Sequence, residues 1–144
     1  MDRPLTLESD IDEIVENFSF LDDWEDRYGY LIELGNALTP VSQDQMSDAN
    51  KVQGCVSQVW LVSHYEDGRL YFKGASDAHI VRGLVAVALS IFSGKTPEEV
   101  TQLDEQDTFK AIGLAEHLTP QRSNGLKSLV GKIKATAQAS LARA

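Results

Sequence analysis

Two strand-like segments joined by the dipeptide Asp67-Gly68 constrain the fold of this chain more than any other feature. The first runs from Val56 to Tyr65 and is rich in β-branched and aromatic residues, and in the second, Arg69 to Lys73, apolar and polar residues alternate. Asp-Gly between two such segments is a strong signal for a two-residue hairpin turn. Because an isolated two-stranded ribbon is marginally stable in water, the predicted hairpin must pack on helices or gain a third strand.

Helical periodicity precedes the hairpin. An amphipathic helix is expected after Ser9. A second helix begins at Asp22 or Asp23, either of which can cap free amides, and is expected to stop at Gly35. A loop with Pro40 and many polar residues follows, and a short strand over residues 51–53 has only weak support. The core-facing residues of the two helices are predicted to be Ile11, Ile14, Val15, Phe18, Trp24, Tyr28, Leu31 and Ile32.

More helices are predicted after the hairpin. One is capped by Ser76 and ended by Gly94, and it is apolar around so much of its circumference that it must be largely buried. The run Thr96-Pro97-Glu98-Glu99 has the form of a capping box and starts a short helix. Another helix is expected over residues 108–112. The last helix, beginning near Ser123 or Asn124, is expected to bury Leu126, Leu129, Val130, Ile133, Ala137 and Leu141.

Helices, a hairpin and helices in this order predict an α+β fold, with helices packed on one face of a small antiparallel sheet. With 144 residues, 42% of them hydrophobic, we expect a single domain over residues 1–144. The residues up to Glu16 are acidic and hold no uninterrupted apolar stretch, and the apolar run Leu84–Phe92 is too short to cross a bilayer. We therefore expect a cytoplasmic protein.

The net charge of −9 argues against nucleic acid as a partner, because phosphate backbones are bound by clustered Lys and Arg. The charge is unevenly spread. Residues 2–26 hold ten carboxylates against Arg3 alone, whereas residues 121–144 hold five basic residues and no acidic one. We interpret this as acids in early helix turns and bases on a solvated helix face, and a charge-steered docking surface remains compatible with it.

Cys55 is the only cysteine. Gly54 directly before it gives the backbone freedom to present the thiol at a loop tip. Gln53, Ser57 and Gln58 are polar and are expected to shape that loop. A solitary cysteine in a small domain is commonly an inert buried thiol, but these neighbours favour a thiol held at the surface or in a shallow cleft.

Three common uses of cysteine fit this sequence poorly. A Cys-His hydrolase needs a base beside the thiol, and His64, His79 and His117 show no motif-grade placement. Structural zinc takes four ligands in paired short spacings, so we expect no metal, and dithiol exchange needs a second cysteine. What remains is a carrier, in which the Cys55 thiolate attacks the outer sulfur of a partner's persulfide and holds it until an acceptor takes it.

Four segments of the chain resemble the SufE group of sulfur-acceptor proteins, which includes the related CsdE proteins. Together they span nearly the whole chain and follow the family's order, which makes the match specific. They are Trp24-Glu25-Asp26-Arg27-Tyr28 with Leu31-Ile32-Glu33-Leu34-Gly35, Val52-Gln53-Gly54-Cys55-Val56-Ser57-Gln58-Val59-Trp60-Leu61, Ser76-Asp77-Ala78-His79-Ile80-Val81-Arg82-Gly83-Leu84, and His117-Leu118-Thr119-Pro120-Gln121-Arg122-Ser123-Asn124-Gly125-Leu126.

The resemblance implies a sulfur acceptor and activator of a SufS-like or CsdA-like cysteine desulfurase, not a stand-alone enzyme. Cys55 would take persulfide sulfur from that partner and carry it to an iron–sulfur cluster assembly scaffold. The resemblance implies no cofactor in this chain, since pyridoxal phosphate belongs to the desulfurase, and a monomer or homodimer. It also implies the two-layer fold that SufE proteins share with IscU-type scaffolds.

The resemblance also points to two residues that support Cys55. Arg122 would be a cation near the cysteine loop that favours the thiolate or contacts the desulfurase, and its alternative is a surface arginine before a helix cap. Asp77 matches a family aspartate near the underside of the loop, and the favoured interpretation is a cap or first-turn charge of the helix after Ser76. The family often has an acidic residue where this chain has Ala75.

Two other classes of function remain open from the residues themselves. One is a non-catalytic protein-interaction module in which Cys55 is structurally buried and the charge asymmetry docks a partner. The other is a cysteine hydrolase that uses one of the three histidines as its base.

Overall fold

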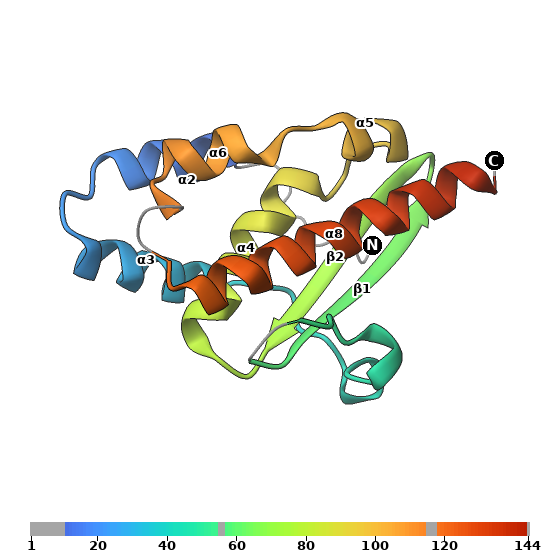
Figure 1. Cartoon of the computed structure of the whole chain (residues 1–144), viewed down its shortest axis with the longest axis horizontal. Helices are drawn as coiled ribbons and strands as arrows, with labels where there is room; N and C mark the ends of the chain where they lie inside the picture. The colour runs from blue at the N-terminus through green and yellow to red at the C-terminus, as the bar shows by residue number, and fades with distance from the viewer. Residues whose placement is uncertain (1–10, 55–56, 115–117, 144) are drawn as a thin grey trace.

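The predicted hairpin is present in the computed structural model, which describes residues 11–54, 57–114 and 118–143 (Figure 1). Strand β1 (Val59–Glu66) pairs antiparallel with β2 (Arg69–Ser76), and Glu66 lies opposite Arg69. Between them, Asp67 has φ of 53° and Gly68 has φ of 80°, the left-handed conformation that a two-residue type I′ turn requires at both positions. The Asp-Gly signal therefore set both the turn and the register of the sheet.

Single backbone pairings border both edges of the hairpin. Lys51 bridges to Trp60 on the β1 side, and Leu70 bridges to Lys95 on the β2 side. On that second edge the buried Ser93 Oγ accepts a hydrogen bond from the Phe72 amide (2.9 Å). The weakly predicted strand over residues 51–53 is thus reduced to one bridge, and the ribbon is stabilised by packing on helices.

Helix α4 (His79–Phe92) packs on β2 and forms the centre of the fold (Figure 1). Every residue from Gly83 to Phe92 is buried, as the apolar circumference predicted. Helices α2 (Ile11–Ser19), α3 (Trp24–Asn36) and α8 (Pro120–Ala142) pack on α4, and α5 (Pro97–Gln102) packs on α8. The remaining elements are the 3-10 turns η1 (Gln43–Gln45) and η2 (Asp48–Asn50) and helix α6 (Glu105–Ala111). The predicted α+β class is confirmed.

Helices α3 and α4 cross at unusually close range because glycines lie at the crossing. A Cβ atom on Gly83 would collide with the carbonyl oxygen of Leu31, and one on Gly35 would lie 2.8 Å from the backbone nitrogen of Gly83. The prediction that Gly35 stops its helix is therefore wrong, since α3 continues to Asn36 with Gly35 buried inside it. Glycine at position 35 allows α4 to approach closely, and it does not end the helix.

Several helix boundaries also differ from the prediction. The capping box at Thr96 is present, with Glu99 bonded to the Thr96 amide (2.9 Å). Helix α6 begins at Glu105 because Asp104 caps it, and α8 begins at Pro120 because Thr119 caps it, in both cases about one turn earlier than predicted. The last helix buries the predicted residues except Leu141, whose 36% exposed surface places it outside the core.

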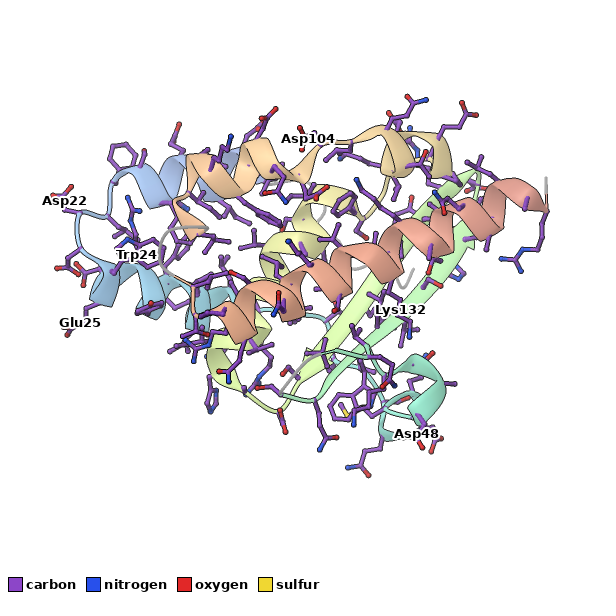
Figure 2. All side chains as sticks on the ribbon, viewed as in Figure 1. Asp22, Trp24, Glu25, Asp48, Asp104 and Lys132 are labelled. Carbon is purple, nitrogen blue, oxygen red and sulfur yellow. The ribbon has the colours of Figure 1, made fainter. Side chains whose placement is uncertain are left out.

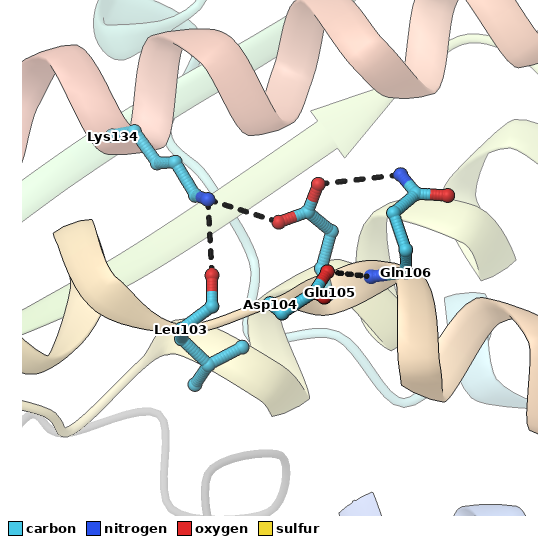
Figure 3. A network of polar contacts seen from close by, with 5 residues as sticks. All are labelled: Leu103, Asp104, Glu105, Gln106 and Lys134. Atoms are coloured by element: carbon cyan, nitrogen blue, oxygen red, sulfur yellow. Dashed lines mark hydrogen bonds and ion pairs between the residues drawn. The ribbon is translucent and has the colours of Figure 1, made fainter.

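A polar network joins the start of α6 to the middle of α8 (Figure 3). Lys134 Nζ donates to the Leu103 carbonyl (3.0 Å) and forms an ion pair with Glu105 Oε1 (3.0 Å). Partial burial pushes the pKa of Glu105 upward, but hydrogen bonds from its own amide, Lys134 and Gln106 outweigh this, so that its pKa lies below the ordinary value. The deprotonated carboxylate is the form that stabilises this junction.

The glycine crossing predicts opposite effects for two alanine substitutions. Gly83→Ala should lower the free energy of unfolding by about 1 to 3 kcal/mol or more, because the new methyl group meets the fixed backbone of α3. Gly131→Ala on α8 should raise it by about 0.5 to 1 kcal/mol, because nothing lies within 4 Å of that position. Urea denaturation measures the free energy of unfolding of both variants. An equal change in the two variants would contradict the close crossing of α3 and α4.

The Glu105 network predicts an acid-sensitive contribution to stability. Because the folded-state pKa of Glu105 is depressed, its stabilisation is complete above the unfolded-state pKa and is lost as the pH falls through the folded-state value. Glu105→Gln should therefore cost about 1 kcal/mol near neutral pH and almost nothing near pH 3. Urea titrations of the wild type and this variant at several pH values test the prediction, and a cost that did not change with pH would contradict the network.

Candidate functional site

Backbone contacts close the base of the segment that contains Cys55. The Val52 amide donates to the Val59 carbonyl (2.8 Å), directly beside the bridge between Lys51 and Trp60. The two ends of the segment over residues 53–58, called the cysteine loop below, are therefore tied together. Cys55 itself, with Val56, lies outside the described residues, so its surroundings are defined by the residues on either side of it.

Gly54, immediately before the cysteine, uses the backbone freedom that glycine provides. Its φ of 89° is one that residues with a side chain rarely adopt. Its backbone also approaches α8 so closely that a Cβ atom there would lie 2.6 Å from Ser128 Oγ. The positive φ is therefore what requires glycine at position 54, since the Ser128 hydroxyl can rotate away and Ser128 Cβ would lie at an ordinary 3.5 Å.

Asp77 fixes the other end of the loop. Its Oδ1 accepts a hydrogen bond from the Gln58 amide (3.1 Å), and its own amide donates to the Gln58 carbonyl (3.3 Å). The favoured interpretation of Asp77 as a helix cap is therefore wrong. The prediction that Ser76 caps α4 is also wrong. The N-cap of α4 is Ala78, which has no side-chain hydrogen bond, and Ser76 Oγ accepts from the Ala78 amide (3.2 Å).

A cavity of about 270 Å³ opens beside the described end of the cysteine loop. Ser57 and Val59 line it from the loop and β1, and Arg122 lines it from the first turn of α8. The Arg122 amide donates to Thr119 Oγ1 (3.2 Å), which fixes the backbone of that turn. The rest of the lining comes from α4 and α8 and is mostly apolar: Val81, Leu84, Val85, Thr119, Gln121, Gly125, Leu126 and Leu129.

The structure brings most of the predicted site residues together. Ser57 and Arg122 share the cavity, Gly54 packs on α8, and Gln58 binds Asp77. Gln53 is exposed at the start of the loop. Because α8 begins at Pro120, Arg122 lies inside the helix and not before its cap, which corrects the alternative interpretation of this residue.

The sequence did not point to Lys132, which reaches the segment leading into the loop. Its Nζ donates to the carbonyls of Ala49 (3.3 Å) and Lys51 (3.2 Å). Partial burial lowers the pKa of this ammonium group. A lysine on a helix that also carries Lys127 and Lys134 has no local signal that would single it out.

Neither His64 nor His79 is among the residues that line this cavity. His64 is exposed on β1 and binds Glu66 (2.9 Å), and His79 is exposed and accepts from Arg82 Nη2 (2.9 Å). His117 lies outside the described residues. Within the described ranges, no three His, Cys, Asp or Glu side chains are placed to hold a metal ion. In the same part of the chain, no helix combines the length and the apolar character that crossing a membrane requires.

Comparison with known proteins gives the class of this protein. A family model described as SufE, an Fe-S metabolism associated domain, matches residues 12–137. An uncharacterized SufE-like protein of Rhizobium meliloti is 54% identical over 135 residues, covering 91% of this chain and 96% of that protein. A second, from Rhizobium etli, is 52% identical over 132 residues, covering 89% of each.

The fold has a counterpart among solved structures. The solution structure of a hypothetical protein from Thermus thermophilus superposes with a TM-score of 0.74 at 21% identity, covering 92% of this chain and 96% of that one. At this identity the likeness supports the fold. With the match of the family model and the two relatives, the chain belongs to the SufE family, which associates it with iron–sulfur metabolism and confirms the resemblance found in the sequence.

The contact between Asp77 and Gln58 predicts a local effect on the cysteine loop. Asp77→Ala should speed hydrogen exchange of the Gln58 amide about tenfold, because that amide loses its acceptor, while global stability falls by about 1 kcal/mol or less at this exposed site. Asp77→Asn keeps an acceptor oxygen and should stay near the wild-type rate. Amide exchange followed by NMR measures both, and an unchanged Gln58 rate in Asp77→Ala would contradict the anchor.

Proposed function

We propose that this protein accepts sulfur from a cysteine desulfurase on Cys55 and carries it as a persulfide to iron–sulfur cluster assembly in the cytoplasm. The observation that carries the proposal is the position of the only cysteine. It lies between Gly54, seated on α8, and Ser57, which shares a cavity with Arg122. Membership of the SufE family supports the same partner and the same metabolism.

The transfer step needs only one thiol on this chain. The Cys55 thiolate attacks the outer sulfur of the desulfurase persulfide, so that a new S–S bond forms while the old one breaks. The electron pair of the broken bond stays on the partner's cysteine sulfur, which leaves as a thiolate, and no external oxidant or reductant is consumed. Removal of that sulfur frees the desulfurase for another turnover, which is how this chain would activate it. The pyridoxal phosphate stays with the partner.

The surrounding residues support the anionic sulfur. A guanidinium favours a nearby thiolate or persulfide anion over its protonated form, and Arg122 places such a group on the wall of the cavity. The apolar side chains of Leu84, Val85 and Leu129 line the same cavity. This sequence has no second cysteine with which Cys55 can close a disulfide, so a persulfide on Cys55 can wait for its acceptor.

The proposal predicts a mass increase of one sulfur atom after incubation with a cysteine desulfurase and free cysteine. Intact-protein mass spectrometry detects the adduct, and since Cys55 is the only cysteine, an adduct removed by a thiol reductant is assigned without ambiguity. Cys55→Ser, the matched control, should keep the fold, gain no sulfur and no longer stimulate the desulfurase.

Two outcomes would overturn this function. One is a desulfurase that turns over normally beside an unmodified wild-type chain. The other is Cys55→Ser retaining full stimulation, which would favour a non-catalytic interaction module. Failure of a bulky alkylating reagent to modify Cys55, together with the absence of the adduct, would indicate a structurally buried thiol.

A further inference from the structure

One face of α8 holds the segment that leads into the cysteine loop. The ammonium group of Lys132 donates to two carbonyls of that segment, Ala49 (3.3 Å) and Lys51 (3.2 Å). In Figure 2, Lys132 lies between α8 and the turn that carries Asp48. One side chain thus binds two backbone positions at the point where the 3-10 turn η2 passes into the base of the loop.

Fixing a lysine side chain in this way costs free energy. A solvated lysine satisfies its three donors with water and keeps about 2 kcal/mol of side-chain entropy. Lys132 instead lies half-buried with its ammonium against neutral carbonyls, and burial lowers its pKa. Lys134, two positions later, has a carboxylate partner in Glu105, whereas Lys132 pairs with no carboxylate in the described part of the chain.

The contact acts on the base of the cysteine loop. Lys51, whose carbonyl is bound, is also the residue that bridges to Trp60, and the next amide, of Val52, donates to Val59. One helical turn before Lys132, Ser128 meets the backbone of Gly54. The same face of α8 therefore touches the chain at Ala49, Lys51 and Gly54, three points within six residues that end directly before Cys55.

From this geometry we propose that Lys132 is a positioning residue for sulfur transfer. It sets the register of the segment that leads to Cys55 in the sequence, and it acts through the carbonyls of Ala49 and Lys51. The inference rests on the proposed function of Cys55. Because persulfide exchange requires the attacking sulfur to lie in line with the bond that breaks, a small displacement of the loop base lowers the rate of transfer.

The test compares three variants of the full-length protein. Lys132→Met removes the donors and keeps most of the side-chain volume, Lys132→Arg keeps a cationic donor, and Lys127→Met removes an exposed charge from the same helix. All are measured where urea denaturation shows them fully folded. The readouts are hydrogen exchange of the Val52 amide and the single-turnover transfer of sulfur from a persulfidated desulfurase, measured as a function of the concentration of this chain.

We expect Lys132→Met to speed exchange at Val52 and to lower the maximal transfer rate about tenfold, with the half-saturating concentration unchanged within about twofold. Lys132→Arg should recover most of that rate, and Lys127→Met should match the wild type. A transfer rate in Lys132→Met equal to that in Lys127→Met would overturn the inference, whether or not exchange at Val52 had changed. Absence of transfer to the wild-type chain would instead refute the proposed function of Cys55.

Discussion

The close crossing of α3 and α4 is the contact on which the rest of this structure depends. Gly83 has no side chain, so the backbone of α3 at Leu31 rests directly on α4. Gly83 is the first of ten consecutive buried residues on α4, which also contacts α2, β2 and α8. The residues just before the crossing connect it to the site, because Asp77 binds Gln58 and Val81 lines the cavity. The packing of two helices thereby fixes one wall of the candidate site and one end of its loop.

The parts of this fold that the sequence predicted are those with local causes. Asp67-Gly68 dictates a hairpin turn because both residues tolerate positive φ, and Thr96 with Glu99 forms a capping box from residues three positions apart. The buried face of α8 follows from the spacing of its apolar residues. Gly54 also belongs to this group, because glycine before the lone cysteine was expected for its backbone freedom, and its φ of 89° uses that freedom.

The parts that could not be predicted depend on contacts between distant segments. In the sequence, Gly35 resembles a glycine that ends a helix. Only the three-dimensional structure shows that it lies where α4 crosses α3. Ser76 and Asp77 precede a helix and resemble caps, yet the loop at Gln58 uses the Asp77 carboxylate instead. Lys132 has no local signal, because its partners lie about eighty residues earlier in the chain. The start of α8 is different, since threonine followed by proline at positions 119–120 is itself a helix-start signal.

The basic residues of α8 show why charge composition alone was misleading here. Five basic residues without an acidic one over residues 121–144, four of them on α8, suggested a solvated face, but Lys132 and Lys134 bind backbone carbonyls of other elements and Arg122 lines the cavity. A single helix therefore supplies a cation on the wall of the cavity and contacts to the segment that leads into the cysteine loop. A cation together with backbone contacts suits the proposed exchange between two sulfurs, because that exchange needs no acid or base from the protein once the thiolate is formed. What such a protein must supply is the position of one atom, and position comes from packed helices and anchored backbone more than from reactive side chains.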